Sequence, residues 1–174
     1  KAMDWFSPTS LRADLFTKSA KGTEIGAPDN IYGKEEPSEG DNYAGIIAYS
    51  YRGKDPRTYV SRDMKEKLKK GARYCVSYKV SLADLSKYAV NNLGAFLSKN
   101  PIEVEGKKDI VLGKGEDFVR IADNKIFEKR YSWETMCGEY VANGGERYIT
   151  IGNFNETTDT EWKKLRKKKD FNGA

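Results

Sequence analysis

The chain has 174 residues, of which 38% are hydrophobic and 12% aromatic; this is enough for one compact core and predicts a single domain over residues 1–174. It contains no histidine, which excludes Ser-His-Asp and Cys-His nucleophilic sites, imidazole metal sites and the commonest general base. The formal net charge is +5, but no basic stripe is interleaved with stacking aromatic residues, so nucleic-acid binding is not predicted. No stretch approaches the roughly 20 apolar residues of a membrane-spanning helix.

The N-terminal part of the chain, from Asp4 to about Glu39, is expected to be rich in loops, because Gly and Pro recur every few residues. The apolar run at 42–49 then predicts a buried strand. Residues 57–68 permit a helix or a strand: their apolar residues lie at helical spacing, whereas 57–61 has the composition of a strand. We favour a strand that runs into a charged turn ending at Lys70-Gly71.

The clearest strand signal lies at 73–82, where apolar and polar residues alternate with a period of two. Further short strands are expected at 93–97, 110–112 and 118–121. Two β-rich runs, 133–142 and 147–154, flank an Asn-Gly-Gly-Glu turn and predict a hairpin. Strands separated by turns, without amphipathic helices, indicate an all-β sandwich.

Several motifs follow one another in a fixed order. They are Trp5 with Pro8-Thr9, Asp14-Leu15-Phe16, PDNIYG at 28–33, GDNYAGI at 40–46, KGARYCVSYKVSLAD at 70–84, SKYAVNNLGA at 86–95 and the run 133–154. In this order they resemble the N-terminal jelly-roll domain of gram-negative cell-envelope proteins that often carry a C-terminal OmpA-type domain. The resemblance implies a jelly-roll β-sandwich of two antiparallel sheets, related in pattern to galactose-binding-like and carbohydrate-binding modules, with its core at about 4–154.

The sequence departs from this family at both ends of the sandwich. Such domains usually open with a strand around Asn-Pro-Ser-Phe-Glu and close with one around Asp-Asp-Val, and these strands help to hold a structural calcium. This sequence contains neither motif. We therefore expect no cofactor; a structural calcium is left open by the resemblance but disfavoured by the missing strands. Together with the start at Lys1, without a targeting segment, this suggests a trimmed piece of an exported protein, or a sandwich completed differently.

Sugar binding needs exposed aromatic faces together with amide and carboxylate groups. The candidates in expected loops are Trp5, Tyr32, Asp84, Tyr88, Asn91 and Asn92. Each also has a structural interpretation: Trp5 as a core anchor, Tyr32 as a cover for the sandwich edge, Asp84 as a turn cap, and the Tyr88, Asn91 and Asn92 cluster as a source of hydrogen bonds within its own loop.

Two further features leave alternatives open. Cys75 and Cys137 lie in expected strands, where they form either a long-range disulfide or two buried thiols. Residues 155–174 form an expected basic loop or tail, with six basic against three acidic residues from Thr157 onward. The lysines from Lys163 to Lys169 could meet phosphates or acidic glycans or could simply be solvated, and Trp162 is expected to dock this segment onto the domain.

The resemblance, together with the 11 tyrosines, implies a non-catalytic glycan-binding module of an exported protein of the cell envelope, in the periplasm or at the outer-membrane surface. The alternative is a structural or protein-interaction domain in an envelope assembly. No pair of carboxylates is singled out for catalysis, so an enzyme is not predicted. Three or more coplanar exposed aromatic rings on one concave face would favour sugar, whereas an open sheet edge would favour a protein partner.

Overall fold

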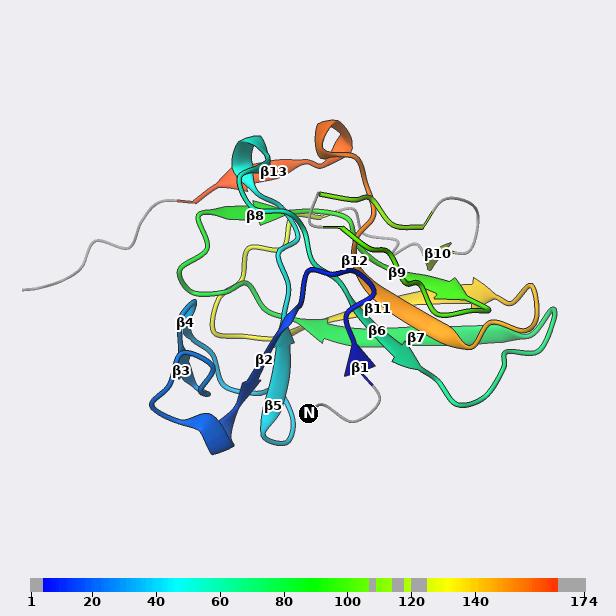
Figure 1. Cartoon of the computed structure of the whole chain (residues 1–174), viewed down its shortest axis with the longest axis horizontal. Coiled ribbons are helices and arrows are strands. Elements are labelled where there is room, and N and C mark those ends of the chain that lie inside the picture. Colours follow the sequence, from blue (N-terminus) through cyan, green and yellow to red (C-terminus); the bar gives the residue numbers. More distant parts are fainter. Residues whose placement is uncertain (1–4, 107–108, 114–117, 120–124, 166–174) are drawn as a thin grey trace, which may run out of the picture.

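The computed structural model describes residues 5–106, 109–113, 118–119 and 125–165. In these residues the chain is all-β: antiparallel strands are joined by loops and short 3-10 helices, without an α-helix (Figure 1). The prediction of an all-β sandwich is confirmed. Its layers are small and the sandwich is not closed.

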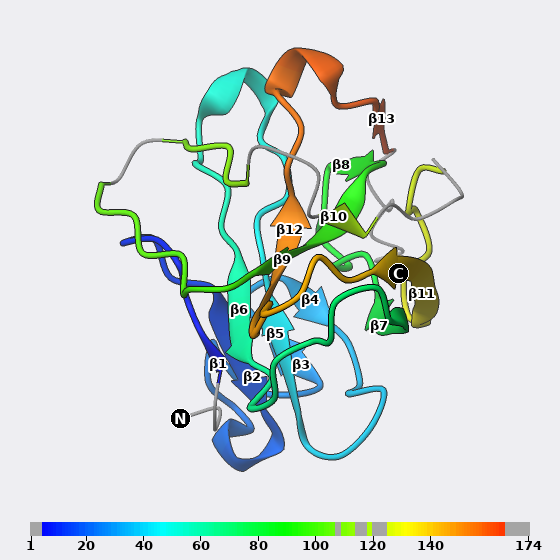
Figure 2. The same cartoon turned by 90° about the vertical axis from the view of Figure 1, so that its right-hand side faces the viewer.

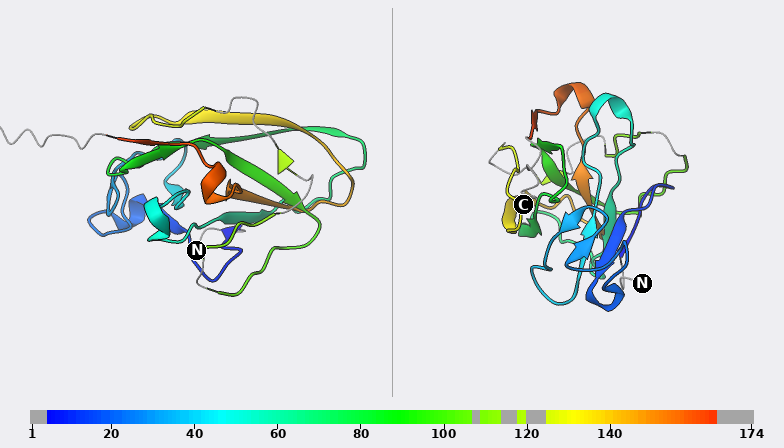
Figure 3. Two further views of the ribbon diagram at one scale, coloured as in Figure 1. Left: turned by 90° about the horizontal axis from the view of Figure 1, so that it is seen from above. Right: turned by 90° about the vertical axis from the view of Figure 1, so that its left-hand side faces the viewer.

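Two layers make up the body of the molecule. The larger sheet has the strand order β1-β6-β12-β9-β10. Its strands are β1 (Trp5–Phe6), β6 (Val60–Asp63), β12 (Tyr148–Asn153), β9 (Leu93–Ser98) and β10 (Phe118–Val119). The second layer is the antiparallel pair β7 (Arg73–Val80) and β11 (Glu134–Val141), which lies along one side of the larger sheet (Figures 2 and 3).

Three two-stranded ribbons extend these layers. They pair β2 (Asp14–Thr17) with β5 (Asn42–Gly45), β3 (Asp29–Asn30) with β4 (Gly33–Lys34), and β8 (Tyr88–Val90) with β13 (Trp162–Lys164). The 3-10 helices are η1 (Lys18–Ala20), η2 (Tyr51–Gly53) and η3 (Thr157–Asp159). In Figure 1 the β2–β5 and β3–β4 ribbons lie at the lower left, while η2, η3 and β13 lie at the top.

The core forms where the two layers face each other. The predicted alternation in β7 is confirmed, because Tyr74, Val76, Tyr78 and Val80 are half-buried while the residues between them are exposed. The Tyr78 hydroxyl crosses the layers and donates to the Leu93 carbonyl at 3.0 Å. The side chains of Ala95, Leu97, Tyr140 and Ala142 form the buried centre. Because many inward-facing residues are only half-buried, this core leaves space open between the elements.

The predicted hairpin at 133–154 is wrong. β11 pairs with β7, and β12 pairs with β6 and β9, so the Asn143-Gly144 turn connects two layers instead of two neighbouring strands. The buried Glu146 explains this geometry: its carboxylate accepts hydrogen bonds from the Tyr140 hydroxyl and from the backbone N–H groups of Asn143 and Gly144. An Asn-Gly signal specifies a turn, but it does not specify which strands pair.

One close approach in the larger sheet requires glycine. The fully buried ring of Tyr59 packs onto Gly152 of β12, where an added Cβ would lie 2.2 Å from a ring carbon. The Tyr59 hydroxyl is in turn 2.9 Å from the Asn153 carbonyl and 3.0 Å from that of Ile110. Tyr59 thereby ties β12 to the segment 109–113.

Several boundaries differ from the prediction. The strand expected at 42–49 is limited to β5, at its beginning, and is half exposed. The strand and charged turn expected in 57–70 are present as β6 and the loop after it. The folded part also continues past 154, because β13 pairs with β8. The remainder of the expected tail, 166–174, lies outside the described residues, as does Ile121 of the expected 118–121 strand.

The two cysteines lie on neighbouring strands, β7 and β11, on their solvent-facing side. Both Cys75 and Cys137 are free and exposed. The structure therefore shows neither of the arrangements that the sequence left open, the disulfide or the buried thiols. Residue 137 lies opposite Ser77, which makes the two cysteines diagonal neighbours. Diagonal positions are about 7 to 8 Å apart, beyond ordinary disulfide geometry.

Candidate functional site

An open cleft of about 1540 Å³ runs between the ribbons and the two layers. The β2–β5 ribbon, the β3–β4 turn, the end of β7 and the start of β8 contribute to its walls. Its aromatic lining residues are Trp5, Phe6, Phe16, Tyr32, Tyr43, Tyr49, Tyr78, Tyr88, Phe127 and Trp133. The cleft exists because these ribbons are too short to close the sandwich.

In the cleft wall, rings from four segments of the chain form the Phe16 group, which comprises Phe16, Tyr32, Tyr43 and Trp133. The Phe16 ring centroid lies 5.1 Å from that of Tyr43 and 6.0 Å from that of Tyr32, while Trp133 meets Tyr43 at 5.6 Å. The Trp133 indole N–H donates to the Glu36 carbonyl at 2.7 Å. These contacts fix the rings, while Tyr32 remains 39% exposed at the rim.

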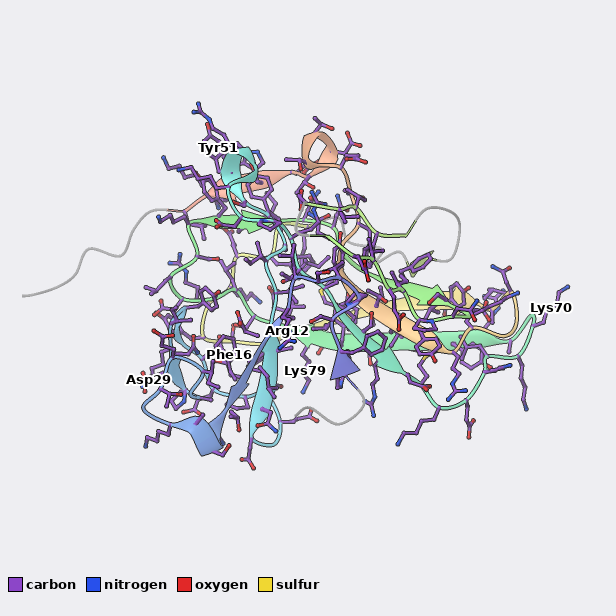
Figure 4. All side chains as sticks on the ribbon, viewed as in Figure 1. Arg12, Phe16, Asp29, Tyr51, Lys70 and Lys79 are labelled. Atoms are coloured by element: carbon purple, nitrogen blue, oxygen red, sulfur yellow. The ribbon has the colours of Figure 1, made fainter. Side chains whose placement is uncertain are left out.

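A second group of rings, the aromatic corner, is formed by Tyr49, Tyr51, Tyr88 and Trp162. Tyr49 and Tyr88 line the cleft, whereas Tyr51 and Trp162 lie outside its lining. Tyr51 stacks on Tyr88 with an interplanar angle of 10°, and Tyr49 stacks on Trp162 with an angle of 21°. The two stacked pairs meet edge to face. Tyr51 and Trp162 are 37% and 42% exposed, and Figure 4 shows Tyr51 at the top of the molecule, away from Phe16.

Polar groups also line the cleft. The polar and charged lining residues include Arg12, Asp14, Asn30, Glu35, Asn42, Lys79, Ser81 and Asp84. Asn30 donates to the Tyr43 hydroxyl at 2.7 Å, and Ser81 donates to the Glu35 carboxylate. Burial raises the pKa of Tyr32, Tyr43 and Tyr49, so these hydroxyls stay protonated and can donate hydrogen bonds at neutral pH. The cleft can therefore offer apolar faces, donors and acceptors to a polyhydroxylated ligand.

Four of the six predicted site residues line this cleft: Trp5, Tyr32, Asp84 and Tyr88. Trp5 is half-buried, and the Arg62 guanidinium lies over its ring at 5.6 Å, so it is not a full core anchor. The Asp84 carboxylate accepts a hydrogen bond from the Tyr131 hydroxyl. The structure thus brings these four residues, which span more than 80 positions, to one concave surface.

The other two predicted residues do not belong to the cleft. Asn91 is fully buried, and its side-chain oxygen accepts the Glu161 N–H at 3.0 Å, so it cannot contact a ligand. Asn92 has a φ of 55° and forms the left-handed turn between β8 and β9. Both residues serve the local structure, which corrects the prediction for this pair.

Tyr49 and Tyr51, which complete the aromatic corner, were not among the predicted site residues, and Trp162 was expected only to dock its segment. Trp162 does dock β13 onto β8, but its ring stays partly exposed beside Tyr88. The Tyr-Ser-Tyr-Arg-Gly stretch at 49–53 carries a usable signal, because two tyrosines precede a glycine turn. Nothing in the sequence indicates that this stretch meets Trp162.

Among the described residues, no three Cys, Asp or Glu side chains form a group that could hold a metal ion. Within the same residues, no helix is long and apolar enough to cross a membrane.

Comparisons with protein-family models, with curated proteins and with solved structures each found no match. The cleft, the Phe16 group and the aromatic corner are therefore the basis for assigning a function.

Proposed function

We propose that the chain is a non-catalytic glycan-binding module and that its ligand lies in the cleft. The observation that carries this proposal is one open cleft lined by aromatic rings together with amide, hydroxyl and carboxylate groups. The rings of the aromatic corner are not coplanar, so the proposal does not rest on a flat aromatic platform. Sugar rings present apolar C–H faces that pack on aromatic side chains, and their hydroxyls need donors and acceptors.

The role is binding without catalysis. Two of the three acidic residues that line the cleft are engaged in local contacts, Asp84 with Tyr131 and Glu35 with Ser81. Hydrolysis of a glycosidic bond needs two carboxyl groups that face each other across the sugar. We further propose that the chain acts in the cell envelope as part of an exported protein, which is what the family resemblance of its motifs implies.

The test is a glycan array followed by calorimetry on the purified chain, with calcium and with chelator, at low and high salt. Tyr32 lies at the rim of the cleft, so Tyr32→Ala removes a stacking face at little cost to the fold. We expect this variant to lower affinity for the best array ligand about tenfold, which corresponds to about 1.4 kcal/mol.

Ile31→Ala is the matched control, because Ile31 is the preceding residue, is 53% exposed and is not part of the cleft wall. It should bind as the unchanged chain does. If Tyr32→Ala and Ile31→Ala weaken binding equally, or if no glycan binds, the cleft is not a glycan site.

A second function is favoured by a separate observation, the open edge of β7. This strand pairs with β11 along one edge, and no described strand pairs with its other edge. Such an edge can accept a strand from a protein partner. In a Cys137→Ser chain, a bulky maleimide label on Cys75 of β7 should block such a partner without affecting glycan binding. If the label abolishes glycan binding, the glycan and the protein partner do not use separate sites.

A further inference from the structure

We infer that the aromatic corner is a subsite for a negatively charged sugar residue, such as a uronic acid or a sulfated sugar. This inference rests on the proposed glycan-binding function and names the ligand class that the corner selects, beside the cleft that Tyr49 and Tyr88 line. It follows from the geometry of the four rings and from two cations beside them.

The rings form a corner and not a flat platform. Each stacked pair is nearly parallel, but the Tyr88 and Trp162 planes meet at 84° with their centroids 5.5 Å apart. Flat crystalline polysaccharides need coplanar rings along a line, which this arrangement does not provide. Because the rings pack against one another, the corner offers only its exposed outer surface, at Tyr51 and Trp162, which suits one sugar residue, as at a chain end.

Two basic residues border this corner. The Arg52 guanidinium carbon lies 5.3 Å from the Tyr51 ring centroid. Lys164 lies directly opposite Tyr88 in the β8–β13 pair, and alternate residues of a strand share a face, so Lys164 is on the same face as Trp162. Among the described residues, neither Arg52 nor Lys164 forms an ion pair, whereas the neighbouring Lys163 is paired with Glu128 at 2.5 Å.

Unpaired cations beside apolar rings favour a ligand with both a C–H face and an anionic group. A carboxylate or sulfate can bind Arg52 or Lys164 through charge-assisted hydrogen bonds while the sugar face packs on a ring. Single-stranded nucleic acid also combines stacking with charge, but it needs a basic groove along its backbone. The lining of the adjoining cleft does not provide such a groove, because it carries three acidic residues (Asp14, Glu35, Asp84) beside three basic ones (Arg12, Lys34, Lys79).

The experiment compares uronic-acid and sulfated oligosaccharides with neutral ones of equal length, using the full chain and calorimetry at low and high salt. The double substitution Arg52→Gln and Lys164→Gln should weaken acidic ligands about tenfold and leave neutral ligands unchanged, since an exposed charge contact contributes up to about fivefold. Trp162→Ala should weaken both classes. Lys67→Gln with Lys69→Gln is the control with equal charge loss, because both lysines are exposed in the loop after β6.

The outcomes separate this inference from the proposed function. If neutral oligosaccharides bind as tightly as acidic ones, the glycan-binding function stands and the acidic subsite is wrong. If no oligosaccharide binds, both are wrong. Two results would show general attraction of polyanions in place of a subsite. The first is that oligo-dT binds as tightly as the acidic oligosaccharides. The second is that acidic oligosaccharides no longer bind when Lys167, Lys168 and Lys169 are changed to Gln.

Discussion

At the scale of single residues, the buried carboxylate of Glu146 is the most constrained polar group. It is 1% exposed and receives hydrogen bonds from the Tyr140 hydroxyl and from two backbone N–H groups. Burial alone raises the pKa of this carboxyl, but the hydrogen bonds outweigh burial and hold it below its usual value. The charged form is thus the one that the fold requires.

This pKa shift makes part of the stability depend on pH. Because the pKa is lower in the folded chain, Glu146 stabilises the fold above the unfolded pKa of about 4.3, and this contribution is lost as pH falls through the folded pKa. Glu146→Gln should lower the free energy of unfolding by about 2 kcal/mol at neutral pH and by much less near pH 3. Urea unfolding at both pH values checks this.

The exposed Glu66 supplies the control for that measurement, since Glu66→Gln should change stability by less than about 0.5 kcal/mol. A deficit in Glu146→Gln that is the same at both pH values would show that the carboxylate charge is not what holds the turn.

At the scale of elements, the β8–β13 ribbon decides whether the aromatic corner exists. Trp162 reaches Tyr88 only because β13 returns to pair with β8. The buried Asn91 secures this return, since its backbone N–H donates to the Glu161 carbonyl and its side chain accepts the Glu161 N–H. A residue predicted to touch ligand thus acts on the site through another element.

Asn91→Ala should remove this link. We expect about 1.5 kcal/mol less stability, because the Glu161 N–H loses its acceptor and the buried Asn91 side chain is removed. Hydrogen exchange at 161–165 should become faster, while exchange in β12 should change little. The adjacent Asn92→Gly is the control, since glycine accepts the left-handed φ of 55° and should leave exchange at 161–165 unchanged. Unchanged exchange in Asn91→Ala would mean that backbone pairing alone holds β13.

At the scale of the whole molecule, Arg57 connects segments that are far apart in the chain. It is 5% exposed, and its guanidinium binds the Asp109 carboxylate through two nitrogens, at 2.9 and 3.0 Å. It also donates to the carbonyls of Asn153 and Asn155. This single side chain therefore fixes the end of β12 and the segment 109–113 to the chain before β6.

Arg57→Lys should lower the free energy of unfolding by about 3 kcal/mol, because an ammonium cannot make the bidentate contact and reach both carbonyls. Chemical denaturation measures the effect. Arg62→Lys is the matched control, because Arg62 is exposed, lies over Trp5 and has no buried partner among the described residues. This variant should lower the free energy of unfolding by no more than about 0.5 kcal/mol. Equal losses in the two variants would contradict the central role of Arg57.

The sequence by itself determined the all-β class of the chain and, for β7, which face the strand buries. The period of two in β7 follows from the pleat, so Tyr74 to Val80 could be assigned correctly without a partner strand. The absence of histidine likewise excluded whole classes of catalytic site, because composition alone decides which side-chain chemistries a chain can supply.

Only the tertiary structure decided which strands pair and which side chains meet. The turn at Asn143-Gly144 was visible in the sequence, but its strands enter different layers because Glu146 is buried between them. Likewise Tyr51, Tyr88 and Trp162 meet only through the return of β13. Local patterns record the conformation of a segment, whereas the choice of partner depends on the summed burial and hydrogen bonds of residues far apart in the chain.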